Sequence, residues 1–312
     1  MAWFSKKKTL PGWMVVGTDS DAIRLAHVDR SAEGRPKVVH WGVVEQNQEK
    51  GGGLQKAVKE YDLERYNCVT LLHPGDYQML VVDAPSVPRD ELKAAIRWRI
   101  KDLLDYHIDD ATIDVLDIPA GRDAPAKSHS MYAVAARNEI VQKQIALFEQ
   151  AGIPLRVIDI PETAQRNVAE LYESADRGIA MLAFDQAGGL LTLSFKGELY
   201  LARRLDVTWA QVVGAGEDQR RPYFERIAVE LQRSLDHFER QNQGIALSEL
   251  LLGPMPEEIG LGAYLGSQLD LQPRQIDLTD AMEISGDAMT AGNQWQLLHA
   301  LGAALRVEAK AL

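Results

Sequence analysis

The stretch VVGTDSDAIRLAHV, residues 15–28, frames how the rest of this chain is interpreted. Its apolar flanks and its polar tip, residues 18–21, predict a strand, a tight turn and a second strand. A hairpin tip of this kind can bind phosphate when it carries glycine and small hydroxyl residues, because backbone amides then approach the phosphate closely. This tip carries Asp19 and Asp21 instead, and aspartate favours tight turns for purely structural reasons. The pattern therefore favours a structural turn and leaves phosphate binding as the alternative.

The length and charge of the chain limit its class. Its 312 residues suit two domains of roughly 100–200 residues each better than one compact core. Apolar residues make up 46% of the chain and charged residues 25%, as in ordinary globular proteins. The 34 basic and 45 acidic residues give a net charge of −11, without the basic excess of a general nucleic-acid binder. We therefore expect no nucleic-acid partner.

The single cysteine and the short apolar runs bear on location. Cys68 lies in the apolar run CVTLL, which predicts a buried strand, and one cysteine excludes internal disulfides and a thiolate zinc site. No apolar run approaches the roughly 20 residues of a membrane-spanning helix, and the start MAWFSKKK does not resemble a signal peptide. We expect a cytoplasmic protein. Trp3 and Phe4 beside lysines 6–8 leave open a contact with an anionic membrane surface, although a solvated tail explains them more simply.

Periodicity beyond the hairpin predicts an α/β protein. We expect a third strand over 37–45, a helix over 54–61 and a strand over 68–72, after which the pattern restarts at Asp76. The next expected elements are strands at 77–84, 111–118, 131–136 and 155–160, helices from Pro88 to Leu104 and over 139–150, and a polar loop at 121–128. The last ones are helices at 161–172, 222–242, 256–269 and 294–307, strands ending at Asp185 and at 190–195, 198–204, 249–252 and 274–278, and a polar loop at 214–221.

The stretch from residue 178 to residue 204 repeats the opening design. It predicts a strand, an aspartate, a tight turn, a strand, a turn and a strand, which suggests two related halves. The segment between them suits a small inserted subdomain. The expected limits are 10–75 for the first half of domain 1, 76–160 for the inserted subdomain, 161–177 for a crossover helix of domain 1, 178–292 for domain 2, and 293–308 for a C-terminal helix that returns to domain 1.

Five stretches, in this order and spacing, resemble a known family. They are VPRDELKAAIRWRIKDLLDYHIDD (87–110), YAVAARNEIVQKQIALFEQAGIPLRVIDIPETA (132–164), LAFDQAGGLLTLSFKGELYLARR (182–204), ERIAVELQRSLDHFE (225–239) and LLLGP (250–254). Over nearly its whole length the chain resembles the PilM-like proteins of type IV pilus machines, and most closely the MshI branch of mannose-sensitive haemagglutinin (MSHA) pili. The cytoplasmic part of the type II secretion protein GspL is a related comparison. The resemblance implies an actin-like ATPase (ribonuclease H-like) fold of two domains, with a subdomain inserted as in the division protein FtsA.

The resemblance also implies a nucleotide site, whose first segment departs from the family's pattern. This segment, similar to a GxDxGSxxxK hairpin, falls on residues 17–24. Gly17 and Asp19 fit, and Arg24 stands near the lysine position, but Asp21 stands where a phosphate-facing glycine is expected. An aspartate about 4 Å from a phosphate would cost about 1 kcal/mol in water and several in a partly dry site.

The other two segments depart as well. The second, similar to DxGx, falls on Asp185 with alanine at the glycine position, unless a slip of one residue brings Gly188 or Gly189 into place. The third is a glycine pair that is here Gly253 followed by proline, which has no amide donor. We therefore expect no catalytic activity, no cofactor and no resident metal. The alternative is a functional actin-like ATP-binding protein or ATPase that holds ATP with Mg and whose nucleotide state switches partner binding. The residues of the expected vestigial site are Gly17, Asp19, Arg24, Asp185, Gly188 and Gly253.

The resemblance implies a partner too. PilM-like proteins hold a short N-terminal cytoplasmic peptide of a PilN-like inner-membrane protein, in a groove between the first subdomain and the inserted one. The chain would then be a cytoplasmic scaffold of a pilus assembly platform at the inner-membrane face, with other platform or pilus motor components as further partners. Trp98 between Arg97 and Arg99 is typical of binding hot spots, although a half-buried helix aromatic explains it more simply. The expected groove residues are Ile96, Trp98, Ile100 and Leu103.

Other chemistry finds little support in the sequence. The seven histidines form no HExxH or HxH pair, and no GxSxG motif is present. Residues 106–110 gather one histidine and two aspartates, but a polar turn between a helix and a strand explains them more simply than a metal site. Filament formation, as in other actin relatives, is neither supported nor excluded.

Overall fold

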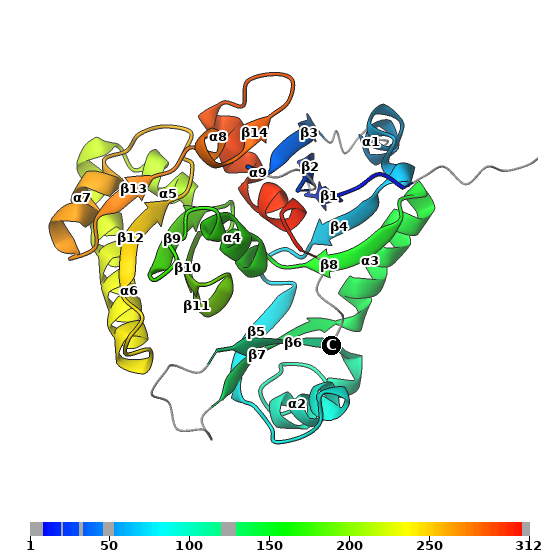
Figure 1. Ribbon diagram of the computed structural model, residues 1–312, viewed down its shortest axis with the longest axis horizontal. Helices are drawn as coiled ribbons and strands as arrows, with labels where there is room; N and C mark the ends of the chain where they lie inside the picture. The colour runs from blue at the N-terminus through cyan, green and yellow to red at the C-terminus, as the bar shows by residue number, and fades with distance from the viewer. Residues whose placement is uncertain (1–8, 20, 31–33, 46–52, 120–128, 308–312) are drawn as a thin grey trace, which may run out of the picture.

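The structure is a computed structural model of the chain, and it describes residues 9–19, 21–30, 34–45, 53–119 and 129–307. Strands and helices alternate through it, which confirms the predicted α/β class. Three β-sheets organise the described residues: two belong to the two halves of the molecule, and the third lies in the insertion below them (Figure 1). The expected loop at 121–128, and Trp3 and Phe4 with the neighbouring lysines, lie outside the described residues.

The first sheet contains the opening hairpin and buries its central strands. In spatial order its strands are β14 (Glu283–Ile284), β3 (Lys37–Glu45), β2 (Ala22–Asp29), β1 (Trp13–Thr18), β4 (Asn67–Leu71) and β8 (Leu155–Asp159). β1, β2 and β3 form an antiparallel meander, whereas β4 runs parallel to β1 and β8 parallel to β4. Met14, Val15 and Val16 of β1 are fully buried, because both faces of the sheet are covered there. Cys68 on β4 is buried, as predicted.

The second sheet repeats the strand order of the first. In spatial order its strands are β11 (Glu198–Leu205), β10 (Gly189–Phe195), β9 (Gly178–Phe184), β12 (Leu247–Leu252) and β13 (Pro273–Gln275). This is the order β3-β2-β1-β4-β8 again, with an antiparallel meander followed by two parallel strands. The repeated design that the sequence predicted is therefore confirmed, and it places the β1–β2 turn and the β9–β10 turn at equivalent positions of the two halves.

The third sheet lies in the insertion between β4 and β8. In spatial order its strands are β5 (Tyr77–Asp83), β7 (Ser130–Arg137) and β6 (Ala111–Ile118). Helix α2 (Leu92–Ile100) covers one face of this sheet. The buried apolar residues between them are Val82, Leu92, Ile96, Ile100, Val115, Met131, Ala133 and Ala135. The insertion therefore has a hydrophobic core of its own.

Two helices between the large sheets hold the halves together. α4 (Pro161–Glu170) and α9 (Ala291–Ala304) pack on each other near the centre of the molecule (Figure 1). A side chain at Gly302 of α9 would collide with the carbonyl oxygen of Ala164 on α4, so this close approach requires glycine. The remaining α-helices are α1 (Gly53–Tyr61) and α3 (Asn138–Ala151) on the first sheet, α6 (Arg221–Gln241) and α7 (Leu261–Gln268) on the second, and the short α5 (Trp209–Gly214) and α8 (Leu278–Ala281).

Two predicted helices are shorter in the structure than the pattern indicated. α2 ends at Ile100, where the chain turns through a hydrogen bond from the Leu103 N–H to the Ile100 carbonyl, so Leu104 lies beyond the helix. The helix expected over 256–269 begins only at Leu261, because Gly260 has a φ of 80° and starts a new helix after a loop. Apolar spacing alone did not reveal these interruptions.

Two short helices near chain turns were not indicated by periodicity. The strand expected over 274–278 stops at Gln275, because the Asp277 side chain accepts a hydrogen bond from Thr279 and caps the start of α8. α5 forms where the pattern predicts no element, and the side chains of Thr208 and Gln211 form its capping box. Both helices are short, so their N-terminal caps are a clearer signal than their apolar spacing.

Candidate functional site

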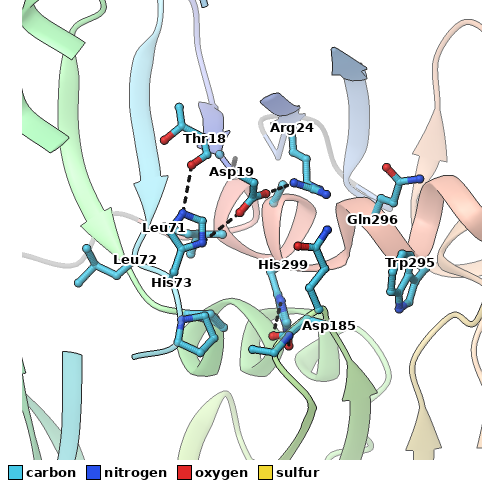
Figure 2. Close-up of a pocket in the computed structure, with 16 residues that line it drawn as sticks. Thr18, Asp19, Arg24, Leu71, Leu72, His73, Asp185, Trp295, Gln296 and His299 are labelled. Carbon is cyan, nitrogen blue, oxygen red and sulfur yellow. Dashed lines mark hydrogen bonds and ion pairs between the residues drawn. The ribbon is translucent and has the colours of Figure 1, made fainter. Parts of the chain in front are cut away.

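A pocket of about 320 Å³ lies between the two halves, where the two equivalent hairpin turns face each other (Figure 2). Its walls come from the β1–β2 turn, the segment after β4, the start of α4, the β9–β10 turn and one face of α9. The side chains that determine its chemistry are Asp19, Arg24, His73, Asp185, Trp295 and His299. Because these residues come from both halves, the pocket exists only when the halves are packed together.

The carboxylate of Asp19 is already paired within the first half. The Arg24 guanidinium on β2 donates a hydrogen bond to Asp19 and lies 3.4 Å from an Asp21 oxygen. His73, just after β4, places Nδ1 3.0 Å from Asp19 Oδ1 and Nε2 3.1 Å from the Thr18 carbonyl oxygen, as Figure 2 shows. Burial lowers the pKa of Arg24, but an arginine stays charged near neutral pH. Arg24 therefore neutralises the charge of Asp19 at this tip.

The carboxylate of Asp185 is paired in the same way within the second half. Arg204 on β11 donates to Asp185 Oδ2 at 2.7 Å, and the backbone N–H groups of Ala187 and Gly188 donate to Oδ1 at 2.9 and 3.0 Å. Burial alone would raise the pKa of Asp185, but His299, Arg204 and these hydrogen bonds outweigh it and lower that pKa. Burial also lowers the pKa of His299, so Arg204 supplies the lasting positive charge at Asp185.

The two turns also bond to each other across the halves. The Gln186 side-chain amide donates to Asp21 Oδ2 at 3.3 Å. Asp21 thus accepts hydrogen bonds from Arg24 in its own half and from Gln186 in the other. The site has a second aspartate at the position where a phosphate-binding hairpin needs an open approach to backbone amides.

The structure brings four of the six predicted nucleotide residues together. Gly17, Asp19, Arg24 and Asp185 line the pocket. Gly188 does not line it: its φ is 144°, and a side chain there would meet the Leu205 carbonyl oxygen, so it serves the close approach of β10 to β11. Gly253 does not line it either, because its N–H bonds to Leu182 at 2.8 Å and its α-carbon packs against Ala183. These two glycines have structural roles in the second sheet.

The predicted groove residues divide into two groups. Ile96 and Ile100 are fully buried in the core of the insertion, so the expectation that they line an open groove is corrected: they hold α2 on its sheet. Trp98 and Leu103 point outward and are 71% and 56% exposed. Only these two remain available to a partner. The two groups differ because residues 96 and 100 share the face of α2 that packs on the sheet, whereas residue 98 lies on the opposite face and Leu103 lies beyond the end of the helix.

Among the described residues, no group of three or more His, Cys, Asp or Glu side chains is arranged to hold a metal ion. His107 at the predicted polar turn accepts a hydrogen bond from the Asp109 N–H and begins a short 3-10 helix. The turn interpretation of residues 106–110 is therefore confirmed.

Of the six side chains that determine the chemistry of the pocket, three were not predicted from the sequence: His73, Trp295 and His299. His73 follows a buried parallel strand directly, and the carboxyl ends of such strands are where ligands meet an α/β sheet, so this signal was present. Trp295 and His299 lie on α9 among apolar residues, and only the packing of α9 between the sheets turns them toward the pocket. His299 approaches Asp185 to 3.9 Å, although 114 residues separate the two in sequence.

Part of the chain matches a known family in sequence. Residues 36–183 match a family model described as type IV pilus assembly protein PilM. This segment contains the complete inserted sheet and strands of the first sheet on both sides of it. A comparison with curated proteins gave no match.

The fold is shared with solved structures. One, described as the PilM-PilN type IV pilus biogenesis complex, has a TM-score of 0.75 at 18% identity and covers 94% of this chain and 98% of its own. The cytoplasmic domain of EpsL, an inner-membrane component of the type II secretion system of Vibrio cholerae, has a TM-score of 0.51 at 16% identity, covering 95% and 96%. A Bacteroides thetaiotaomicron protein with an actin-like ATPase fold has 0.51 at 11%, covering 91% and 96%. The fold is therefore the expected actin-like ATPase fold.

Residues 36–183 thus match PilM in sequence, and the chain shares its fold with a solved PilM-PilN complex. Neither comparison concerns the MshI branch. As for a membrane, the described part of the chain contains no helix with the length and apolar character to span one.

Proposed function

We propose that this chain is a scaffold of a type IV pilus assembly platform, in the MSHA-like branch, that holds a PilN-like membrane protein. The observation that carries the proposal is the match of residues 36–183 to the PilM family, because this segment includes the insertion on which the resemblance places the peptide groove. A solved structure with the same fold is a complex of PilM with PilN, which supports the choice of partner. Bound to the cytoplasmic peptide of an inner-membrane protein, the chain works at the inner-membrane face, where other platform or motor components can join it.

The exposed side of α2 is the surface that we propose for the peptide. Trp98 is a large apolar side chain with most of its area in solvent, and Lys101 lies 5.7 Å from its ring centroid. The neighbouring Arg97 and Arg99 are held by Asp109 and by the Asp83 carbonyl, at 2.7 and 2.9 Å. A tryptophan among ordered cations is typical of an interface hot spot, since it offers a large contact area at a low cost in entropy.

The test is a calorimetric titration with a synthetic peptide that carries the N-terminal cytoplasmic residues of the PilN-like protein from the same organism. We expect saturable binding, and Trp98→Ala should weaken it by roughly 30-fold, or about 2 kcal/mol. The matched control is Val229→Ala, an apolar residue on α6 that is 48% exposed in the other half of the molecule, which should leave the affinity unchanged. Absence of any binding would contradict the scaffold proposal, whereas binding that Trp98→Ala leaves intact would remove Trp98 from the groove.

We infer further that the pocket residues do not fit Mg-bound ATP. Asp19 and Asp185, the two carboxylates that the resemblance would offer to a metal, are each paired with an arginine of their own half. Asp21 adds a negative charge beside the expected phosphate position. Gly253 packs against Ala183 and does not line the pocket. The site is therefore proposed to be degenerate, and no catalytic step is assigned to it.

One observation favours the alternative of a nucleotide switch. Gly17, Asp19, Arg24 and Asp185 line a single pocket between the halves. Titration with Mg-ATP, with thermal unfolding followed in parallel at about 1 mM ligand, separates the two functions, since a ligand at 100 times its Kd adds about 2.7 kcal/mol of stability. No heat and no shift support the degenerate site. Heat together with a raised melting temperature would overturn it and favour the ATP-binding protein.

A further inference from the structure

A row of polar contacts leads from the pocket into the insertion. Arg204 on β11 donates from one nitrogen to Asp185 at 2.7 Å and from Nε to Glu162 Oε1 at 3.3 Å. Glu162 stands in the first turn of α4 with only 5% of its side chain exposed. Its other oxygen accepts a hydrogen bond of 2.5 Å from the hydroxyl of Tyr77, the first residue of β5. One guanidinium is thus shared by a pocket carboxylate and by the carboxylate that holds the insertion.

The insertion is attached to β11 at a second place. The Tyr132 hydroxyl on β7 donates to the Tyr200 carbonyl at 3.2 Å and accepts from the Ala202 N–H at 3.1 Å. β11 is an edge strand of its sheet, and an edge strand leaves alternate backbone groups without a strand partner. Tyr132 takes the place of such a partner. Burial raises the pKa of Tyr132 to about 12 and also raises that of Tyr77, so both hydroxyls keep their protons.

Through these two attachments, β11 contacts both the pocket carboxylate Asp185 and the inserted sheet. β10 begins just after the turn that carries Asp185 and pairs with β11 along its length. Tyr77 and Tyr132 belong to two strands of the inserted sheet. In such a buried network a change at one partner alters the hold on the next. If Asp185 no longer holds Arg204, the guanidinium is free to turn fully toward Glu162 or away from it, and Tyr77 responds.

We propose that β11 couples the pocket to the inserted subdomain, through Arg204 and through Tyr132. A cation or cationic ligand that competes with Arg204 for Asp185 would change how firmly the insertion is held on the second half. The coupling belongs to this chain's own residues and holds whether or not the partner is a PilN-like peptide. It predicts reciprocal effects, because a coupling free energy acts equally in both directions.

Hydrogen exchange followed by mass spectrometry tests the coupling without any ligand. Asp185→Asn keeps the size of the side chain and removes its charge, and it should speed exchange of the β5 and β7 amides by about 3-fold or more. In the other direction, Tyr77→Phe should speed exchange of the Ala187 and Gly188 amides, which Asp185 holds. Acceleration confined to residues 178–205 in the first variant, and to the insertion in the second, would overturn the proposal.

Matched controls separate coupling from general loosening. Asp206→Asn removes a fully exposed carboxylate at the end of β11, 3.7 Å from Arg226, and should leave the insertion unchanged. Tyr106→Phe removes a hydroxyl of the insertion that has no hydrogen-bond partner among the described residues, and it should leave the pocket turn unchanged. If Asp185→Asn does not fold, Tyr132→Phe replaces it, since it cuts the second attachment; unchanged exchange in residues 185–188 of that variant would contradict the coupling.

Discussion

Replacing Arg204 by methionine removes the one charge that Asp185 and Glu162 share. The side chains of these two carboxylates are only 21% and 5% exposed, so water replaces little of the lost interaction. Removing one partner of a buried ion pair costs about 3–5 kcal/mol. Arg204 itself is 29% exposed, which places the expected loss near the lower end, at about 3 kcal/mol. A urea unfolding series followed by circular dichroism measures this difference near neutral pH.

The pH dependence of Arg204→Met provides a second check with a definite sign. In the wild type the pKa of Asp185 is lowered, so its contribution to stability is present above the unfolded pKa and is lost as pH falls through the folded pKa. Without Arg204, burial still raises that pKa and only His299 and the backbone hydrogen bonds lower it, so the pKa of Asp185 is higher than in the wild type. The stability deficit of the variant therefore shrinks as pH falls through this higher pKa, because the protonated carboxyl no longer needs the missing charge. Arg226→Met, which removes an exposed pairing with Asp206, should cost less than about 0.5 kcal/mol. A deficit below about 1 kcal/mol, or one that does not change with pH, would refute this reasoning.

Three further outcomes are expected. Gly302→Ala forces a methyl group against the Ala164 carbonyl and should lower the free energy of unfolding, measured by urea titration, by about 1–3 kcal/mol. Gly214→Ala has open space around it and should not destabilise the protein; equal effects of the two variants would contradict the close packing of α9 on α4. Burial raises the pKa of the Cys68 thiol to about 12, so a thiol reagent near pH 8 should label the native protein far more slowly than the unfolded one, and fast native labelling would show that β4 opens. Asp21→Gly should strengthen any Mg-ATP binding by roughly 5-fold or more, measured by calorimetry, and an unchanged affinity would show that the Asp21 charge is not the obstacle.

The elements of the fold were predicted best where the signal is local. The hairpin of residues 15–28, the meander of residues 178–204 and the buried strand around Cys68 all follow from alternating or continuous apolar residues between turn residues. The interruption of the helix at Gly260 and the caps at Asp277 and Thr208 were missed, because a single residue's backbone conformation or hydrogen bond decides them.

The sequence by itself determined the repeated strand-and-turn design and the aspartate-rich hairpin tip, because strand periodicity and turn chemistry act between near neighbours. The predicted limits of the insertion, 76–160, were too wide, because α3 packs on the first sheet and β8 belongs to it. Only the tertiary structure decided what those aspartates do. Asp185 meets Arg204 across a sheet and His299 on a helix from the other end of the chain, and Tyr77 meets Glu162 across 85 residues. Such pairs depend on strand register and on the packing of α9 and α4 between the sheets. No local pattern predicts these pairs, because the partners are far apart in the sequence and meet only when the sheets and helices pack together.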